Sequence, residues 1–117
     1  MMIITTMTLG ATMIVALAIG GLLTLYQLRQ ANDVVNSARA IFAADTGVEL
    51  GLYRYFQGIE YANPVFIEDA QVTIACYNAI VDPGFTTPIL CSNPLSTVIR
   101  TRGISGRSQR ALQFNLQ

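Results

Sequence analysis

Apolar residues dominate the first 28 positions of the chain, and no charged side chain occurs before Arg29. A helix needs about 20 apolar residues to span a bilayer, and the run from Ile3 to Tyr26 is that long. Threonines interrupt this run, and each hydroxyl can donate a hydrogen bond to a carbonyl oxygen of the preceding helical turn. They are Thr5, Thr6, Thr8, Thr12 and Thr24. The pattern predicts a helix that is apolar on every side.

Beyond Arg29 the apolar residues recur mostly at spacings of three and four, which is the periodicity of an amphipathic helix. They are Val34, Val35, Ala38, Ile41, Phe42, Val48, Leu52, Tyr55 and Phe56. No proline precedes Pro64, so both stretches are predicted to form one helix that ends near Gln57, with Gly58 as its C-terminal cap. We expect the apolar stripe to hold the rest of the fold.

Beyond Gly58 the sequence changes to short runs that proline and glycine interrupt. In residues 70–79 apolar and polar side chains alternate, with Val72, Ile74 and Cys76 on one face, which predicts a strand. Residues 81–94 contain three prolines and a glycine, so this segment is predicted to be a loop.

A β-hairpin is predicted at the C-terminal end of the chain. Residues 96–105 and 107–117 form its two strands, joined around residues 103–107. In the second strand Leu112, Phe114 and Leu116 alternate with polar neighbours, so one face of the hairpin needs an apolar partner. The amphipathic half of the helix is the obvious partner. A small antiparallel sheet packed on a helix gives an α+β architecture.

Two cysteines, Cys76 and Cys91, lie beyond the apolar helix. They are too few for a tetrahedral zinc site, no histidine can complete one, and the C-x-x-C redox spacing is absent. We therefore expect no metal site. In an exported domain the two residues are expected to form one disulfide. Its loop of fourteen intervening residues would stabilise the fold by roughly 3 kcal/mol in the chain-entropy model.

The elements divide the 117 residues into three regions. Residues 1–28 are expected to be a hydrophobic transmembrane or filament-core helix, residues 29–57 its amphipathic continuation, and residues 58–117 a small globular β-rich head with one disulfide. The chain beyond the apolar helix suffices for a modest core but not for two domains, because short chains bury a small share of their surface. The expected fold class is α+β, with one long N-terminal helix packed against a small C-terminal antiparallel sheet.

Seven arginines balance seven acidic residues, and the chain has no lysine or histidine. This balance argues against bulk electrostatic attraction to nucleic acid, so no direct nucleic-acid site is expected. The charges are nevertheless segregated, because all acids lie in residues 33–82 and four arginines lie in residues 100–110. This basic tail is either a solvated strand or a surface that meets the acidic middle segment, within one subunit or between neighbours.

Candidate catalytic groups are scarce. Without histidine the serines lack a partner base, and no phosphate-cradling loop occurs, so we expect no enzyme activity, no catalytic residue and no cofactor. Asp45 and Glu49 lie one helical turn apart and could mimic a catalytic carboxylate pair. A solvated or salt-bridged helix face explains them better, with Arg54 as a candidate partner.

Glycines in the predicted helix need an explanation, since each costs roughly 1 kcal/mol relative to alanine. Gly47 and Gly51, one turn apart, are expected to let the sheet pass close to the helix. Gly20 and Gly21 either allow close helix packing in apolar surroundings or mark a place where the helix can unwind locally.

The stretch AIFAADTGVELGLYRYF, residues 40–56, resembles the Ala-Ala-acid-x-Gly-Ile/Val-Glu signature of minor pilins and related pilin-like proteins. The matching residues are Ala43, Ala44, Asp45, Gly47, Val48 and Glu49. An uncharged N-terminal helix that continues into an amphipathic one, followed by a small sheet, also resembles a type IV pilin after leader removal. The tail GISGRSQRALQFNL is similar to the closing hairpin of those proteins.

The resemblance implies a structural subunit of a bacterial type IV pilus, or fimbrium, or of a related filament. In that family a prepilin peptidase removes a basic leader at the inner membrane, the new N-terminal residue is methylated, and assembly machinery builds a helical polymer. Met1 would be the processed residue, and the partners would be further copies of this chain and other pilins. The protein would reside in a cell-surface filament, with a membrane-embedded precursor pool. Gly20 and Gly21 lie where pilin helices unwind.

One position departs from the family pattern. Most major pilins carry Glu at the fifth mature residue, where this chain has Thr5. A hydroxyl can accept a hydrogen bond from an ammonium group but supplies no charge to offset it in an apolar core. The difference indicates a minor or tip subunit, a filament with other assembly chemistry, or a numbering that does not begin at the mature end.

Two other classes of protein would use the same helix differently. A single-pass membrane protein with a small exported binding domain would keep it in the bilayer and never polymerise. A phage or envelope coat protein would pack it among other copies in a similar way to a filament.

Overall fold

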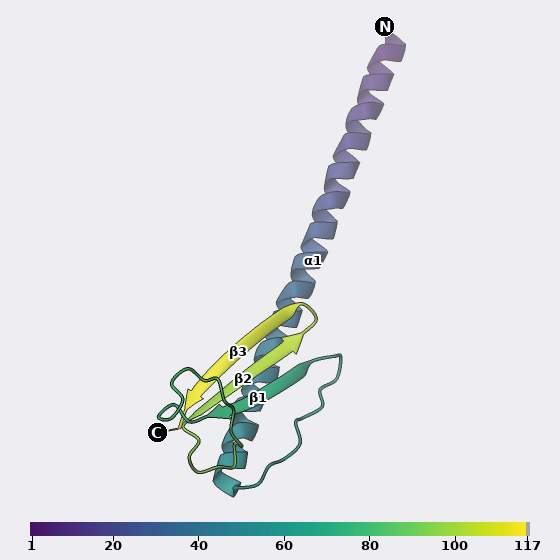
Figure 1. The fold of residues 1–117 in the computed structure, drawn as a ribbon. Helices are drawn as coiled ribbons and strands as arrows, with labels where there is room; N and C mark the ends of the chain where they lie inside the picture. Colours follow the sequence, from purple (N-terminus) through teal and green to yellow (C-terminus); the bar gives the residue numbers. More distant parts are fainter. Residues whose placement is uncertain (117) are drawn as a thin grey trace. The chain divides into compact units, whose positions relative to one another are not determined.

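The computed structural model describes residues 1–116, which form one helix and three strands (Figure 1). The helix α1 comprises Met2–Gln57, and the strands are β1 (Gln71–Tyr77), β2 (Val98–Ser105) and β3 (Ser108–Asn115). The fold is therefore α+β, as the sequence predicts. Gln117, the last residue of the expected head, lies outside the described residues.

The chain divides into two compact units, Met1–Val34 and Val35–Gln117. The first unit consists of the N-terminal part of α1, and the second contains the rest of α1 together with the sheet. We call the second unit the head from here on. Residues 35–57 of the helix thus belong to the same unit as the sheet.

The C-terminal end of α1 has the predicted glycine cap. Gly58 has a φ of +67°, a conformation that side-chain-bearing residues avoid. Its N–H donates to the carbonyl oxygen of Arg54 at 2.9 Å and so satisfies one of the free carbonyls of the last turn.

The three strands form one antiparallel sheet in the order β1-β2-β3 (Figure 1). The predicted hairpin is β2–β3, and its turn is shorter than expected because Ser105 already pairs with Ser108. Gly106 occupies the first turn position with a φ of +56°, as a two-residue hairpin loop with leading glycine requires. In residues 78–97, which connect β1 to β2 along the chain, the only β-pairing is an isolated bridge of Ile89 to Cys76, in agreement with the predicted loop.

The sheet lies against α1 at a row of small residues. A Cβ added at Gly103 of β2 would stand 1.9 Å from the carbonyl oxygen of Ala40, so the two backbones nearly touch. A Cβ at Gly47 would stand 2.6 Å from Cγ2 of Val72 in β1, and one at Gly51 would stand 2.8 Å from Cγ2 of Ile99 in β2. The expectation that these two helical glycines let the sheet pass closely is confirmed.

The expected role of the large apolar stripe is wrong for most of its members. The buried residues of α1 are Ala40, Ala43, Ala44, Gly47, Gly51 and Arg54. Within the predicted stripe, Phe42 is 71% exposed and Phe56 is 76% exposed, and only its central and last-turn members are partly covered. The partly covered members are Val48, Leu52 and Tyr55. The physical reason is that a close approach of backbones needs small side chains at the contact, which displaces bulky ones to the flanks.

The core of the head forms around the disulfide. Cys76, Cys91 and Ile99 are buried together, and Leu52 and Ile74 pack against them from α1 and β1. Thr101 lies on the same face of β2, and its hydroxyl donates to the carbonyl oxygen of Ala44 at 2.8 Å. This hydrogen bond joins sheet to helix in the middle of the buried contact.

Candidate functional site

Residues 2–34 of α1, called the N-terminal segment of α1 from here on, present an apolar surface that no other described residue covers. Every residue from Met1 to Val35 is exposed, including large side chains such as Leu17. The helix is long and apolar enough to cross a membrane by length and composition. An exposed apolar surface of this extent marks a site that another apolar phase covers.

The threonines of this segment make the predicted hydrogen bonds within the helix. The hydroxyl of Thr5 donates to the carbonyl oxygen of Met2 at 2.8 Å, and that of Thr24 donates to the carbonyl oxygen of Gly20 at 2.9 Å. Thr6, Thr8 and Thr12 donate to preceding carbonyls in the same way. The hydroxyl protons are thus satisfied internally, so the threonines do not make one side of the helix polar.

Gly20 and Gly21 lie inside the continuous helix α1, and apart from the adjacent residues and the backbone of the helix itself, no group of the described chain lies within 4 Å of the place where their Cβ atoms would be. They are therefore helical here, with open space beside them. The predicted local unwinding stays a prediction for an assembled state.

The pilin-like helix signature is split between two faces of α1. Ala43, Ala44 and Gly47 are buried against the sheet, whereas Asp45 and Glu49 are exposed on the side away from it. Neither carboxylate forms an ion pair among residues 1–116. The signature therefore supplies a close packing face and an acidic outer face at once.

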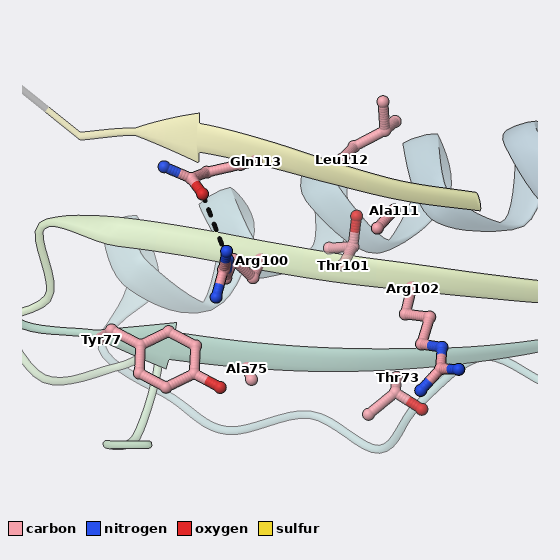
Figure 2. Close-up of a pocket in the computed structure, with 9 residues that line it drawn as sticks. All are labelled: Thr73, Ala75, Tyr77, Arg100, Thr101, Arg102, Ala111, Leu112 and Gln113. Carbon is pink, nitrogen blue, oxygen red and sulfur yellow. Dashed lines mark hydrogen bonds between the residues drawn. The ribbon is translucent and has the colours of Figure 1, made fainter. Parts of the chain in front are cut away.

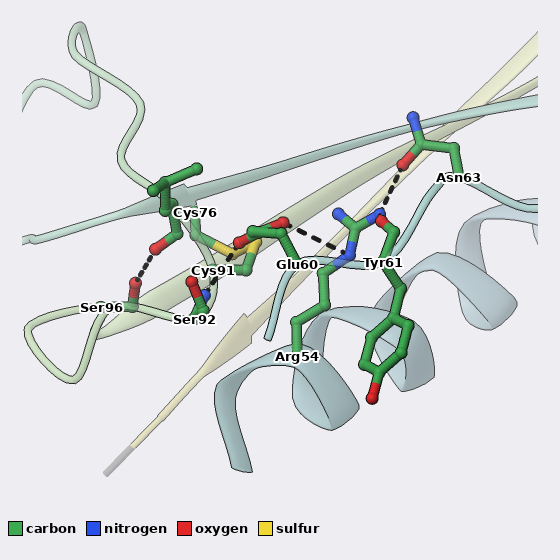
Figure 3. Close-up of polar contacts among 9 residues, drawn as sticks. Arg54, Glu60, Tyr61, Asn63, Cys76, Cys91, Ser92 and Ser96 are labelled. Atoms are coloured by element: carbon green, nitrogen blue, oxygen red, sulfur yellow. Dashed lines mark hydrogen bonds and ion pairs between the residues drawn. A yellow bond between two sulfur atoms is a disulfide. The ribbon is translucent and has the colours of Figure 1, made fainter. Parts of the chain in front are cut away.

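Arg54 does not serve as the expected partner of those carboxylates. Its side chain is almost fully buried and turns toward the loop that follows α1 (Figure 3). Nη2 donates to Oδ1 of Asn63 at 2.9 Å and to the carbonyl oxygen of Tyr61, while Nε lies 3.5 Å from Oε2 of Glu60. The expected pairing with Asp45 or Glu49 is wrong because these residues project from the opposite side of the helix.

The Arg54 cluster also reaches the disulfide loop. The second carboxylate oxygen of Glu60, Oε1, accepts a hydrogen bond from the N–H of Ser92 at 2.9 Å (Figure 3). Ser92 directly follows Cys91, which is bonded to Cys76 as predicted. One buried guanidinium thus connects the helix end to the cross-linked loop. The sequence offers no signal for this link, since Glu60 stands in a segment without periodicity.

Asp82 organises the loop that the disulfide closes. Its Oδ2 accepts hydrogen bonds from the N–H groups of Thr86 and Thr87, both at 2.7 Å, and from both hydroxyls. Its Oδ1 accepts from the N–H of Gly84 at 3.2 Å. These donors, the Thr87 N–H above all, lower the pKa of the Asp82 carboxyl to about 2, because each stabilises the charged form.

The face of the sheet turned away from α1 is polar and basic (Figure 2). Arg100 and Arg102 project from β2, and a shallow hollow of about 530 Å³ extends over them and the flanking strands. We call this surface the outer sheet face. Nε of Arg100 donates to Oε1 of Gln113 at 3.1 Å, and its guanidinium lies 4.7 Å from the ring centre of Phe85. Phe85 has a φ of +53°, a conformation that costs a side-chain-bearing residue about 1 kcal/mol.

The arginines of the C-terminal tail form no ion pair with an acid among residues 1–116. Ion pairs in the described part of the chain involve Arg39 with Glu68 and Arg54 with Glu60. Arg110, by contrast, donates to the hydroxyl oxygen of Ser37 at 2.8 Å. The tail thus reaches the middle segment of the same subunit through Arg110 and Ser37, but it forms no ion pair with the acids of that segment in the described part of the chain.

Comparison with protein-family models, with curated proteins and with solved structures finds no match for this chain. A long apolar N-terminal helix, a small antiparallel sheet and one disulfide fit a pilin-like fold. The surfaces described above are accordingly the basis on which a function can be assigned.

Proposed function

We propose that this protein is a structural subunit of a type IV pilus or a pilus-like extracellular filament, and that it polymerises through the N-terminal segment of α1. One observation carries the proposal: this segment is uncharged to Leu28, and its apolar side chains are exposed on every side. Such a helix can leave lipid and enter a bundle of identical helices at little hydrophobic cost, because both surroundings are apolar.

The proposed role assigns each part of the chain a task. The N-terminal segment is held by the membrane before assembly and by other copies, or other pilins, afterwards. The head stays outside the apolar core, and its disulfide suits an oxidising, extracellular setting. Assembly motors and the peptidase would be separate proteins, so the proposed role requires no catalytic or cofactor site in this chain.

Thr5 bears on how neighbouring copies would pack. Its hydroxyl proton is committed to Met2 of the same helix, which leaves only a lone pair for a neighbour's amine. The hydroxyl is also neutral, so this residue would not offset the charge of that amine. A filament of this chain would hold together through apolar packing in the helix bundle and through contacts between heads.

The test places a charge inside the proposed helix bundle. Leu17→Glu, in cells that produce the full chain with pilus assembly machinery, should abolish sheared surface filaments in electron micrographs. A carboxylate among apolar helices is unpaired and costs about 2.5–3.5 kcal/mol or more per copy. Leu17→Ile, which keeps the apolar surface, should assemble like the wild type.

The amount of chain in the membrane fraction must be measured alongside, because the same charge could hinder membrane insertion. Normal filament yield from Leu17→Glu would contradict packing of this segment in the filament core. A wild-type chain that stays in the membrane fraction and forms no filaments with the machinery present would favour the alternative, a non-polymerising single-pass membrane protein with a small exported binding domain.

A further inference from the structure

The outer sheet face presents two arginines side by side without an acidic partner. Arg100 and Arg102 are both exposed, and no carboxylate of residues 1–116 lies within ion-pair distance of either. Their Cα atoms are two residues apart on one strand, which separates them by about 6.6 Å. Gln113 and Phe85 hold the guanidinium of Arg100 in place, so this charge is positioned rather than mobile.

The exposed side of α1 in the head presents the complementary arrangement. Asp45 and Glu49 point away from the sheet, and neither has a cationic partner in the described chain. One helical turn separates them, which places their Cβ atoms about 6 Å apart. Phe42 and Phe56 flank them and are largely exposed. We call this surface the outer helix face.

We propose that the outer sheet face of one copy docks on the outer helix face of the next copy, with Arg100 and Arg102 opposite Asp45 and Glu49. The inference rests on the proposed filament function and identifies the contact between heads. The two pairs have opposite sign, and their side chains leave the strand and the helix at similar intervals, so both ion pairs can form at once. The exposed phenylalanines give the same contact apolar area to bury.

The geometry of the head favours an open chain of copies over a closed pair. The two surfaces lie on opposite sides of the head, because one faces away from α1 and the other faces away from the sheet. A contact between two different surfaces is heterologous and repeats from copy to copy, which generates a ring or a helical filament.

A nucleic acid is a weaker candidate for the outer sheet face. Residues 35–117 contain six arginines and six acidic residues, so the head has no net charge to attract a polyanion. Among the exposed acids of the described head, Asp45 and Glu49 form a pair that lacks an ion-pair partner and whose spacing suits the two arginines. A second copy is therefore the partner that the charges favour.

The experiment measures association of the full chain in detergent by sedimentation equilibrium. A sheet variant carries Arg100→Glu and Arg102→Glu, and a helix variant carries Asp45→Arg and Glu49→Arg. Each should associate about tenfold more weakly than the wild type or worse, because like charges then face one another. Raising the salt from about 0.1 M to about 1 M should weaken the wild type in the same direction.

Mixing the two variants is the decisive step. In an equimolar mixture each contact again joins opposite charges, so association should return toward the wild-type level. A control with Arg107→Glu, compared with the single reversal Arg102→Glu, reverses one charge in the turn of the same hairpin, away from the outer sheet face, and should associate normally. If a double variant lacks a cooperative thermal transition, the single reversals Arg102→Glu and Glu49→Arg provide the same comparison.

Several results would overturn the inference. They are unchanged association of both variants, failure of the mixture to recover, weakening by Arg107→Glu equal to that by Arg102→Glu, and a wild-type chain whose heads do not associate. Binding of a labelled single-stranded oligonucleotide that Arg100→Glu and Arg102→Glu abolish, with self-association intact, would assign the face to nucleic acid instead. Normal filaments from the sheet variant and from the helix variant would reject this contact but leave the proposed function standing. The filament yield of Leu17→Glu tests the proposed function and does not depend on this contact.

Discussion

Gly103 is the residue at which β2 comes closest to α1, and the absence of its side chain is a packing requirement. A Cβ there would lie 1.9 Å from the carbonyl oxygen of Ala40 and 2.8 Å from the backbone nitrogen of Ala44. These neighbours are backbone atoms that cannot rotate away. A substitution at this position must therefore move the sheet as a whole.

Gly103→Ala should lower the free energy of unfolding of the head by about 3 kcal/mol or more, at the upper end of overpacking costs. Denaturant titration of the full chain, followed by tyrosine fluorescence, measures this change. Gly84→Ala is the matched control, since its Cβ would meet other groups only at ordinary contact distances, from 3.5 Å. We expect that variant to stay within about 0.5 kcal/mol of the wild type.

Asp82 gives the head a defined pH dependence. Hydrogen bonds from Thr86 and Thr87 lower the pKa of its carboxyl from 3.8 to about 2 in the folded chain. Because the folded pKa is the lower one, the stabilisation is complete above the unfolded pKa and is lost as the pH falls toward the folded pKa.

The melting temperatures of the wild type and of Asp82→Asn, measured over a range of pH, test this contribution. The wild type should melt at a higher temperature above about pH 5, and the difference should shrink between about pH 4 and about pH 2. The comparison removes the contribution of the other acids, which both proteins share. A difference that persists undiminished at the acid end would contradict the role given to this carboxylate.

At the scale of elements, the disulfide links a strand to a loop that has little regular structure. Cys76 lies in β1 and Cys91 near the end of the segment that Asp82 organises. Replacing both cysteines with serine should lower the free energy of unfolding by about 3 kcal/mol, because the unfolded chain regains the freedom of this loop. Wild-type protein treated with reductant should show a similar loss, and unchanged melting of both would refute the cross-link as a source of stability.

The elements themselves were largely predictable from the sequence. The single helix to Gln57, the glycine cap, the strand around Cys76 and the terminal hairpin all follow from periodicity and turn residues. The helix face that holds the sheet did not follow from them. Periodicity locates the bulky apolar residues, but the sheet packs on alanines and glycines, because its own Gly103 lets the backbones approach to near contact.

At the scale of the whole molecule, stability and assembly should be separable. Leu17 is 76% exposed, so Leu17→Glu should leave the unfolding of the head unchanged while filaments are lost. Gly103→Ala should have the opposite effect. It should lower the free energy of unfolding of the head, while the N-terminal segment of α1 keeps its apolar surface and its capacity to pack in a filament. Melting curves and filament yields of the two variants, measured side by side, test this; a loss of head stability in Leu17→Glu would contradict it.

By itself, the sequence determined the kinds of element and their order, because the run of uncharged residues, the three-to-four spacing and the strand alternation are properties of neighbouring residues. It also predicted one disulfide, because the chain beyond the apolar helix contains two cysteines. Only the tertiary structure decided which surfaces are free. Arg54 pairs with Glu60 inside the head, the tail arginines form no ion pair among residues 1–116, and Asp45 and Glu49 are exposed. These outcomes depend on contacts between residues far apart in the chain, which no local pattern encodes.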